Sequence, residues 1–328
     1  MSRARETRVE VRDPAAFGKV AVMLGGRSSE REVSLETGHA VLRALRSRGV
    51  AAEPWDPAER DWREFVAADF DRVWIALHGP GGEDGTLQGA LEWLGIAYTG
   101  SGVLASALAM DKLRSKKLFG SAGIATPEYR VVESAADAER AAAEIGLPLV
   151  LKPVGEGSSV GMTKVFRHDE LAPAASLALR YGGLAFAERC IEGDEITVGV
   201  LQGKALPSIR IETPRVFYDY EAKYHADSTR YFCPGGDAAA ERRYAQAAMA
   251  AFDELGCSGW GRVDFMVDRD GTPWVLEVNT VPGMTGHSLV PMAAKAAGLD
   301  FAELSWRILE TSMSPGGAGS SRVEAKNA

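Results

Sequence analysis

Two carboxylates and one amide near the end of the chain have the spacing of a cation site. Asp264 lies in one apolar run, and Glu277 and Asn279 lie two residues apart in the next. Because Asp270-Gly271 separates the runs, the sequence predicts a β-hairpin. A two-residue turn would place Asp264 opposite Glu277 with Asn279 on the same face, whereas a three-residue turn would shift the register and separate Asp264 from Glu277. Such oxygen ligands suit Mg²⁺ or Mn²⁺ that binds substrate phosphates.

The competing interpretation of these acids is a solvated strand face with scattered carboxylates. Glu277 argues against it, because this residue interrupts an apolar run and is followed by Val278. A carboxylate in that position needs a charged or hydrogen-bonding partner.

A glycine- and serine-rich segment, residues 157–161, could bind phosphate through backbone N–H groups and hydroxyls. Lys152 precedes it on an apolar strand and Lys112 opens a predicted helix, so either lysine could add positive charge. The segment matches neither a Walker A loop nor GxGxxG. By itself it is equally typical of a surface hairpin.

Three further segments place polar groups beside strand ends. Residues 188–195 could offer backbone groups and carboxylates to a nucleobase and a ribose, or could form a charged linker. Residues 25–32 could contact substrate, or could cap a helix through Ser28 or Ser29. His78 could contact substrate, or could lie at the core edge and bond to backbone.

The apolar pattern around these groups predicts an α/β region followed by α+β regions. Strands expected at 19–24, 72–77 and 96–99 alternate with helices at 34–48 and 85–94, which predicts a parallel sheet with ligands at the carboxyl ends of its strands. Beyond residue 101 we expect strands at 149–153, 162–165, 195–201, 205–211, 261–267 and 273–278, with helices at 110–121, 241–255 and 301–313. The predicted divisions are a flexible tail (1–18), three domains (19–101, 102–190 and 191–313) and a second tail (314–328).

Composition excludes several classes of protein. The 328 residues are 46% hydrophobic and 25% charged, which excludes a disordered chain. The net charge of −8 gives no overall attraction to nucleic acid or an anionic membrane, and no apolar run approaches the ~18 residues of a membrane span. The first 19 residues lack the apolar stretch of a secretory signal. Three cysteines without CxxC spacing fit a reducing, cytoplasmic location.

In order along the chain, several motifs resemble those of the D-alanine–D-alanine ligases of the ATP-grasp superfamily. They cover the body from about residue 20 to 309, at 25–34, 76–79, 81–85, 110–112, 152–153, 156–162, 218–224, 259–264, 277–285 and 287–291. The resemblance implies an ATP-grasp fold, in which an N-terminal parallel α/β domain precedes two α+β subdomains that enclose ATP. It also implies a cytoplasmic homodimer with no nucleic-acid or membrane partner.

The resemblance further implies a role for individual residues. ATP would be bound by Lys112, Lys152, Ser158, Ser159, Glu188, Ile191, Glu195 and Lys223, with Glu188, Ile191 and Glu195 around adenine and ribose. Two Mg²⁺ or Mn²⁺ ions would be bound by Asp264, Glu277 and Asn279. The first D-alanine would contact Glu30, His78, Arg262 and the Gly283 N–H, and the second Ser288, Leu289 and Lys223. Glu30, Ser158 and Tyr224 would form a hydrogen-bonded set that closes the site.

The implied reaction joins two D-alanine molecules through a D-alanyl phosphate, with release of ADP and phosphate, for peptidoglycan precursor synthesis. The alternatives are a ligase that uses D-lactate or D-serine as the acceptor, or a non-catalytic ATP-grasp nucleotide sensor. The sequence departs from the family pattern at Arg189, Gly155, Val281 and Gly286, where relatives often have Lys, Arg, Ser and Ser. None of these departures removes a predicted metal ligand or a partner of the substrate carboxylate.

Overall fold

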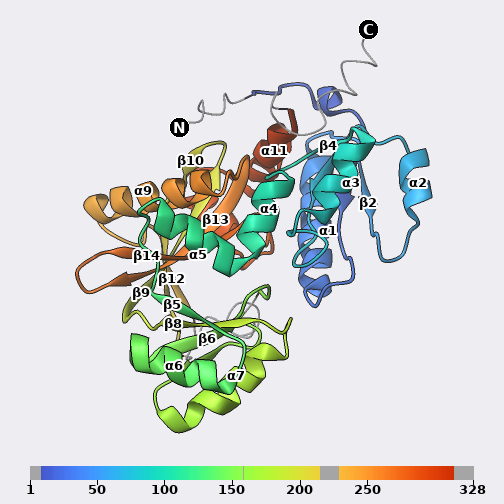
Figure 1. Cartoon of the computed structure of the whole chain (residues 1–328). Helices are drawn as coiled ribbons and strands as arrows, with labels where there is room; N and C mark the ends of the chain where they lie inside the picture. Colours follow the sequence, from blue (N-terminus) through green and yellow to red (C-terminus); the bar gives the residue numbers. More distant parts are fainter. Residues whose placement is uncertain (1–8, 158, 215–228, 314–328) are drawn as a thin grey trace.

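The computed structural model describes residues 9–157, 159–214 and 229–313. The predicted site residues Ser158, Lys223 and Tyr224 lie outside the described residues. The described chain forms three bodies, each built on one sheet (Figure 1).

The N-terminal sheet is parallel throughout, as predicted, and includes one edge strand that the sequence pattern did not reveal. Its spatial order is β2 (Ala52–Trp55), β1 (Val20–Met23), β3 (Arg72–Ile75) and β4 (Ala97–Tyr98). The connecting helices are α1 (Arg31–Ser47), α2 (Trp62–Ala67) and α3 (Thr86–Leu94). Because β1 and β3 are buried along their whole length, they read as uninterrupted apolar runs. The glycine pair after β1 and His78 after β3 therefore lie at the same edge of the sheet.

The second sheet is antiparallel and forms the lowest body in Figure 1. Its order is β5 (Tyr129–Val132), β8 (Ala185–Arg189), β6 (Leu149–Pro153) and β7 (Thr163–Val165). The helices α6 (Ala135–Ile145) and α7 (Leu171–Leu179) pack on it through a small-residue core that includes Ala138, Ala141, Ala174 and Ala178.

The third sheet is also antiparallel and is covered by α9 (Ala238–Glu254). Its order is β12 (Arg230–Phe232), β11 (Ile209–Glu212), β9 (Gly193–Leu201), β13 (Trp260–Asp268) and β14 (Pro273–Asn279), and β10 (Lys204–Ala205) pairs with β9. Three short 3₁₀ helices complete the described elements, at Pro14–Phe17, His168–Glu170 and Thr311–Met313.

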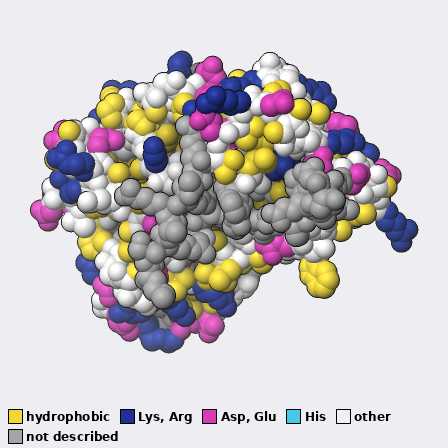
Figure 2. Space-filling model, turned by 90° about the horizontal axis from the view of Figure 1, so that it is seen from above, with side chains coloured by type: hydrophobic (Ala, Val, Ile, Leu, Met, Phe, Trp, Pro, Cys, Tyr) yellow, Lys and Arg dark blue, Asp and Glu magenta, His cyan; other side chains and the backbone are white. Residues whose placement is uncertain are grey.

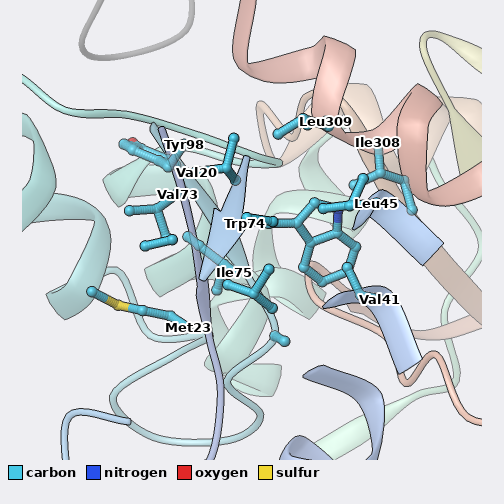
Figure 3. Close-up of a cluster of buried hydrophobic side chains, with 14 of the residues drawn as sticks. Val20, Met23, Val41, Leu45, Val73, Trp74, Ile75, Tyr98, Ile308 and Leu309 are labelled. Atoms are coloured by element: carbon cyan, nitrogen blue, oxygen red, sulfur yellow. The ribbon is translucent and has the colours of Figure 1, made fainter. Parts of the chain in front are cut away.

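Two pairs of helices join cores that are distant in sequence. The helices α4 (Val103–Met110) and α5 (Lys112–Ser121) share the core of the third sheet. The helices α10 (Leu289–Ala296) and α11 (Phe301–Glu310) contribute to the core of the N-terminal sheet. Figure 3 shows Trp74 of β3 among Val41 and Leu45 of α1 and Ile308 of α11. The Trp74 indole N–H donates to the Ser305 carbonyl at 3.3 Å, which fixes α11 against the first body.

The hairpin formed by β13 and β14 corrects the sequence prediction. The Asp268 N–H donates to the Thr272 carbonyl at 3.2 Å, so the turn contains three residues and the two-residue prediction is wrong. A β-bulge then adds one residue, Leu276, to β14. The bulge restores the predicted pairing of Asp264 with Glu277, even though the turn that was expected to produce it does not exist.

Among the described residues, no helix is long and apolar enough to span a membrane. On the face shown in Figure 2, basic and acidic side chains lie among one another rather than in separate fields. None of the three cysteines forms a disulfide.

Candidate active site

One pocket lies between the second and third sheets and gathers most of the predicted nucleotide and metal residues. The predicted residues that line it are Lys112, Lys152, Ser159, Glu188, Ile191, Glu195, Arg262, Asp264, Glu277 and Leu289. Strands β6 and β8 supply one wall, and β9, β13 and β14 supply the other. Lys112 and Glu277 therefore line the same pocket although they lie 165 positions apart in the sequence.

A buried cluster of two lysines and a glutamate lies on the second-sheet side. Glu188 in β8 accepts from Lys152 in β6 through one carboxylate oxygen and pairs with Lys116 of α5 through the other, at 2.5 Å. The Glu188 side chain is 2% exposed. Burial alone would raise its pKa, but the two ammonium groups outweigh this effect and hold the pKa of Glu188 below its usual range. The carboxylate is therefore ionised at neutral pH.

Lys112 connects the glycine-rich loop with the hairpin. Its ammonium group donates to the Glu156 carbonyl at 2.7 Å and lies 3.2 Å from a Glu277 carboxylate oxygen. Asp111 caps α5 by accepting from the Arg114 N–H, which fixes the position from which Lys112 extends. A positive charge is thus held where the loop and the hairpin meet.

The three predicted metal ligands lie on one side of the hairpin. Asp264 accepts from the Asn279 amide at 3.0 Å, from the Thr197 hydroxyl at 2.6 Å, and from Arg262 Nε at 2.8 Å and Nη2 at 2.7 Å. Cationic side chains thus already neutralise both carboxylates, Asp264 through Arg262 and Glu277 through Lys112.

This donor set fits a hard divalent cation. It offers two carboxylates that line the pocket and, next to Asp264, the amide of Asn279, which does not itself line the pocket. No cluster of three or more His, Cys, Asp or Glu side chains suitable for a metal occurs within the described ranges. A cation here would consequently need oxygen ligands from a bound substrate as well as from the protein.

A second polar cluster surrounds His78 at the carboxyl edge of the N-terminal sheet. The His78 Nδ1 faces the Val281 carbonyl at 2.9 Å and lies 3.7 Å from a Glu83 carboxylate oxygen. Burial lowers the pKa of His78, but Glu83, the charge of Glu30 and the Val281 carbonyl outweigh burial and raise it overall. Both sequence interpretations of His78 are compatible with this geometry, because it bonds to backbone and also lies beside acidic groups.

Glu30 lies between two loops from different bodies. A Cβ atom added to Gly79 would lie 3.0 Å from a Glu30 carboxylate oxygen, and one added to Gly157 would lie 3.4 Å from the same oxygen. The glycine-rich loop therefore approaches the N-terminal domain at Glu30. The predicted helix cap is wrong: α1 begins at Arg31 with Glu30 as N-cap, and Ser28 instead donates to the His78 carbonyl at 2.7 Å.

The segment that contains Gly283 connects this cluster with α10. The Thr37 hydroxyl accepts from the Met284 N–H at 3.1 Å and lies 3.2 Å from His78 Nε2. Ser288 accepts from the Thr285 N–H at 2.9 Å as the chain enters α10. The described part of the predicted substrate set thus lies along one path from His78 to Leu289.

Several residues of these clusters were missed as site residues. Lys116 and Thr197 carry no motif of their own, although Lys116 lies four residues after Lys112 on one helix face. Glu83 belongs to a matching motif but was given no role. Leu276 faces the pocket because of the bulge, which alternation along the strand could not indicate.

Known proteins match this chain along nearly its whole length. The family model described as "D-ala D-ala ligase C-terminus" matches residues 118–310, and "D-ala D-ala ligase N-terminus" matches residues 53–101. The D-alanine–D-alanine ligase of Methylococcus capsulatus is 54% identical over 303 residues, which are 92% of this chain and 98% of the relative. That of Alkalilimnicola ehrlichii is 55% identical, over 90% of this chain and 94% of the relative.

The chain belongs to the D-alanine–D-alanine ligase family.

Solved structures of this family have the same fold. The D-alanine–D-alanine ligase of Bacillus anthracis matches with a TM-score of 0.80 at 38% identity, over 94% of this chain and 99% of that one. A D-alanine–D-alanine ligase of Bacillus anthracis complexed with ATP matches with a TM-score of 0.78 at 34% identity, over 94% of this chain and 99% of that one. The VanG D-Ala:D-Ser ligase of Enterococcus faecalis matches with a TM-score of 0.76 at 33% identity, over 90% and 99%. The ATP-grasp fold predicted from the sequence is confirmed.

Proposed function

We propose that this protein joins two D-alanine molecules to D-alanyl-D-alanine, with ATP as the source of energy, for peptidoglycan precursor synthesis. The observation that carries the proposal is the single pocket in which Lys112 and Lys152 face the Asp264–Glu277 hairpin. A carboxylate is a poor electrophile, so the reaction passes through a D-alanyl phosphate and releases ADP and phosphate.

ATP occupies the pocket between the second and third sheets. Lys112 and Lys152 bind its phosphates, together with Ser158 and Ser159 of the loop and Lys223, of which Ser158 and Lys223 lie outside the described residues. Glu188, Ile191 and Glu195 surround adenine and ribose. Asp264, Glu277 and Asn279 would hold two Mg²⁺ or Mn²⁺ ions, which would supply positive charge opposite the phosphates.

The two amino acids bind beside the phosphates, toward the N-terminal domain. Glu30 accepts from the ammonium group of the first D-alanine near His78. Arg262 and the Gly283 N–H bind its carboxylate and later stabilise the tetrahedral oxyanion. Ser288 and Leu289, with Lys223, position the second D-alanine.

Water must be excluded while the acyl phosphate exists, since hydrolysis would waste it. The approach of Gly157 to Glu30 supports a loop that covers the reacting groups from the second-sheet side. Ser158 and Tyr224 complete this cover in the proposal, and both lie outside the described residues.

A D-serine or D-lactate acceptor is the second candidate, and the likeness to a D-Ala:D-Ser ligase is the observation that favours it. Phosphate release from ATP, measured with and without D-alanine, tests the first candidate. The same assay with D-alanine plus D-serine or D-lactate, with products separated by mass, tests the second. Release that does not depend on D-alanine would contradict both candidates, and no release under any condition would leave the nucleotide-sensor alternative.

The proposal includes a cytoplasmic homodimer. Two large apolar side chains are exposed on neighbouring helices, Trp93 of α3 at 94% and Leu104 of α4 at 71%, and a second copy of the chain could cover them. Trp93→Glu should therefore halve the mass measured by light scattering, whereas Trp62→Glu, at a 39% exposed tryptophan on α2, should not change it. A wild-type monomer at micromolar concentration would contradict the dimer.

A further inference from the structure

Lys116 is a deeply buried cation that lies behind the wall of the nucleotide pocket. Its side chain has no exposed surface, and it does not line the pocket. It lies behind Glu188, which forms part of the pocket wall.

The contacts of Lys116 suit a charged ammonium group: burial lowers its pKa, and the charge of Glu188 opposes that shift. It faces three acceptors: Glu188 at 2.5 Å, the Thr126 hydroxyl oxygen at 2.6 Å and the Pro127 carbonyl at 3.2 Å. Thr126 donates its own proton to the Val275 carbonyl at 2.8 Å, so its oxygen has to accept from Lys116. Lys116 thus makes two hydrogen bonds and one close ion pair.

These contacts join both walls of the pocket. Glu188 belongs to β8 of the second sheet, and Val275 belongs to β14 of the third, directly before the bulge residue Leu276. Lys116 therefore fixes the Glu188 carboxylate relative to the strand that carries Glu277.

The cluster holds one negative charge between two positive charges. Among the described residues, Tyr129 on β5 pairs with Glu188 in the strand register and Cys190 follows along the chain, where the charges of Lys164 and Glu192 act on it. Burial raises the pKa of both Tyr129 and Cys190, so these two stay neutral. Glu188 consequently depends on the lysines to remain ionised, and Lys116 is the one that cannot turn toward a ligand.

We propose that Lys116 is a positioning residue for nucleobase selectivity, because it keeps Glu188 an ionised acceptor at the pocket wall. An ionised carboxylate favours a base with a 6-amino donor and repels one with a 6-oxo group. This inference rests on the proposed placement of adenine beside Glu188. Lys116 thereby sets the preference for ATP over inosine triphosphate without touching either nucleotide.

Binding of the two nucleotides to the full-length protein tests this proposal. Affinities for ATP and inosine triphosphate are measured by displacement of a fluorescent ADP analogue between pH 6 and 8.5. In the wild type, the ratio of the two affinities should favour ATP and should not change with pH. A wild type that binds both nucleotides equally would overturn the proposal.

Lys116→Met should give a pH-dependent ratio. Without Lys116 the pKa of Glu188 rises, so that more of this carboxyl is protonated at pH 6. The protonated carboxyl donates to the 6-oxo group of inosine triphosphate. The preference for ATP at pH 6 should therefore fall about tenfold relative to pH 8.5. Loss of positive charge should also weaken the binding of both nucleotides equally at pH 8.5, so the ratio of the two affinities there stays unchanged. Lys117→Met, at the exposed neighbouring lysine, is the matched control and should behave as the wild type.

A folded Lys116→Met protein with the wild-type ratio at every pH would overturn the proposal, because a merely structural lysine would change affinity without changing this ratio. If that variant does not fold, Lys116→Gln retains a donor without charge and carries the same expectation. Glu188→Gln should lose the preference at all pH values, and a retained preference would equally overturn the proposal. Phosphate release with D-alanine is measured separately, so failure of the ligase function and failure of this inference remain distinguishable.

Discussion

At the scale of single residues, the carboxylates of the hairpin are held by cations that belong to the proposed catalytic machinery. Arg262 makes two hydrogen bonds to Asp264, and Lys112 lies 3.2 Å from Glu277. These pairs hold both carboxylates at the pocket wall. They also explain how Asp264 and Glu277 can lie on strands whose opposite face packs in the core. Each carboxylate has the cationic partner that a half-buried position requires.

Asp264→Asn and Glu277→Gln should abolish turnover while the protein remains folded. Each change removes one ligand charge opposite the phosphates but keeps the size of the side chain. Phosphate release in saturating Mg²⁺ measures turnover, and thermal unfolding measures the fold. Asp270→Asn, an exposed acid at the tip of the same hairpin, should retain activity. Near-normal activity of either pocket variant would contradict the proposed metal site.

Sequence reasoning identified residues that carry a motif and missed residues that act through a neighbour. Asp264, Glu277 and Asn279 could be predicted because strand alternation places them on one face. Lys116 could not, because its partners come from β8 and from the segment before β5, and their approach is fixed only by tertiary packing.

At the scale of elements, the hairpin shows how two local errors can cancel. The sequence predicted the correct pairing of Asp264 with Glu277 from the wrong turn, since a three-residue turn and the bulge at Leu276 shift the register in opposite directions. The bulge leaves Val275 and Val278 in the core and directs both Leu276 and Glu277 to the pocket. It therefore adds an apolar contact beside a proposed metal ligand.

Leu276→Ala should weaken nucleotide binding and leave the chemical step intact. Loss of this apolar surface should raise the KM for ATP by about three- to tenfold with little change in kcat. Deletion of Leu276 should act similarly, because the ladder without the bulge still pairs Asp264 with Glu277. Leu104→Ala, at an exposed leucine of α4, should change neither constant. A collapse of kcat in the deletion variant would show that the bulge orients Glu277 itself.

Several of the elements that were not predicted lack a clear hydrophobic periodicity in the sequence. Helix α7 is apolar nearly all round, so the contrast between its faces is weak, whereas α6 has a polar face but buries mainly alanine. Strand β5 is a short edge strand with one buried residue among four. Strands β1 and β3, by contrast, are wholly buried and were predicted from uninterrupted apolar runs.

At the scale of the whole molecule, the cores do not follow the order of the chain. Along the chain, the first sheet ends with β4 at Tyr98 and the second with β8 at Arg189. Helices α4 and α5, however, pack with the third sheet, and α10 and α11 pack with the first. The C-terminal helix thus connects the body that carries Glu30 and His78 to the body that carries Arg262 and Asp264.

This long-range packing predicts that a change near the C-terminus destabilises the N-terminal domain. Ile308 is fully buried beside Trp74, so Ile308→Ala should leave a cavity and cost about 2–5 kcal/mol of unfolding free energy. Denaturant unfolding, followed by tryptophan fluorescence, measures this loss.

The same variant separates the two halves of the active site. Because α11 packs on the N-terminal sheet, nucleotide binding between the second and third sheets should persist in Ile308→Ala at temperatures where the dependence on D-alanine is already lost. Met313→Ala, only partly buried at the margin of the same core, should cost less and retain both properties. Simultaneous loss of nucleotide binding and of D-alanine dependence would mean that the three bodies unfold as one unit and that α11 does not act on the first body alone.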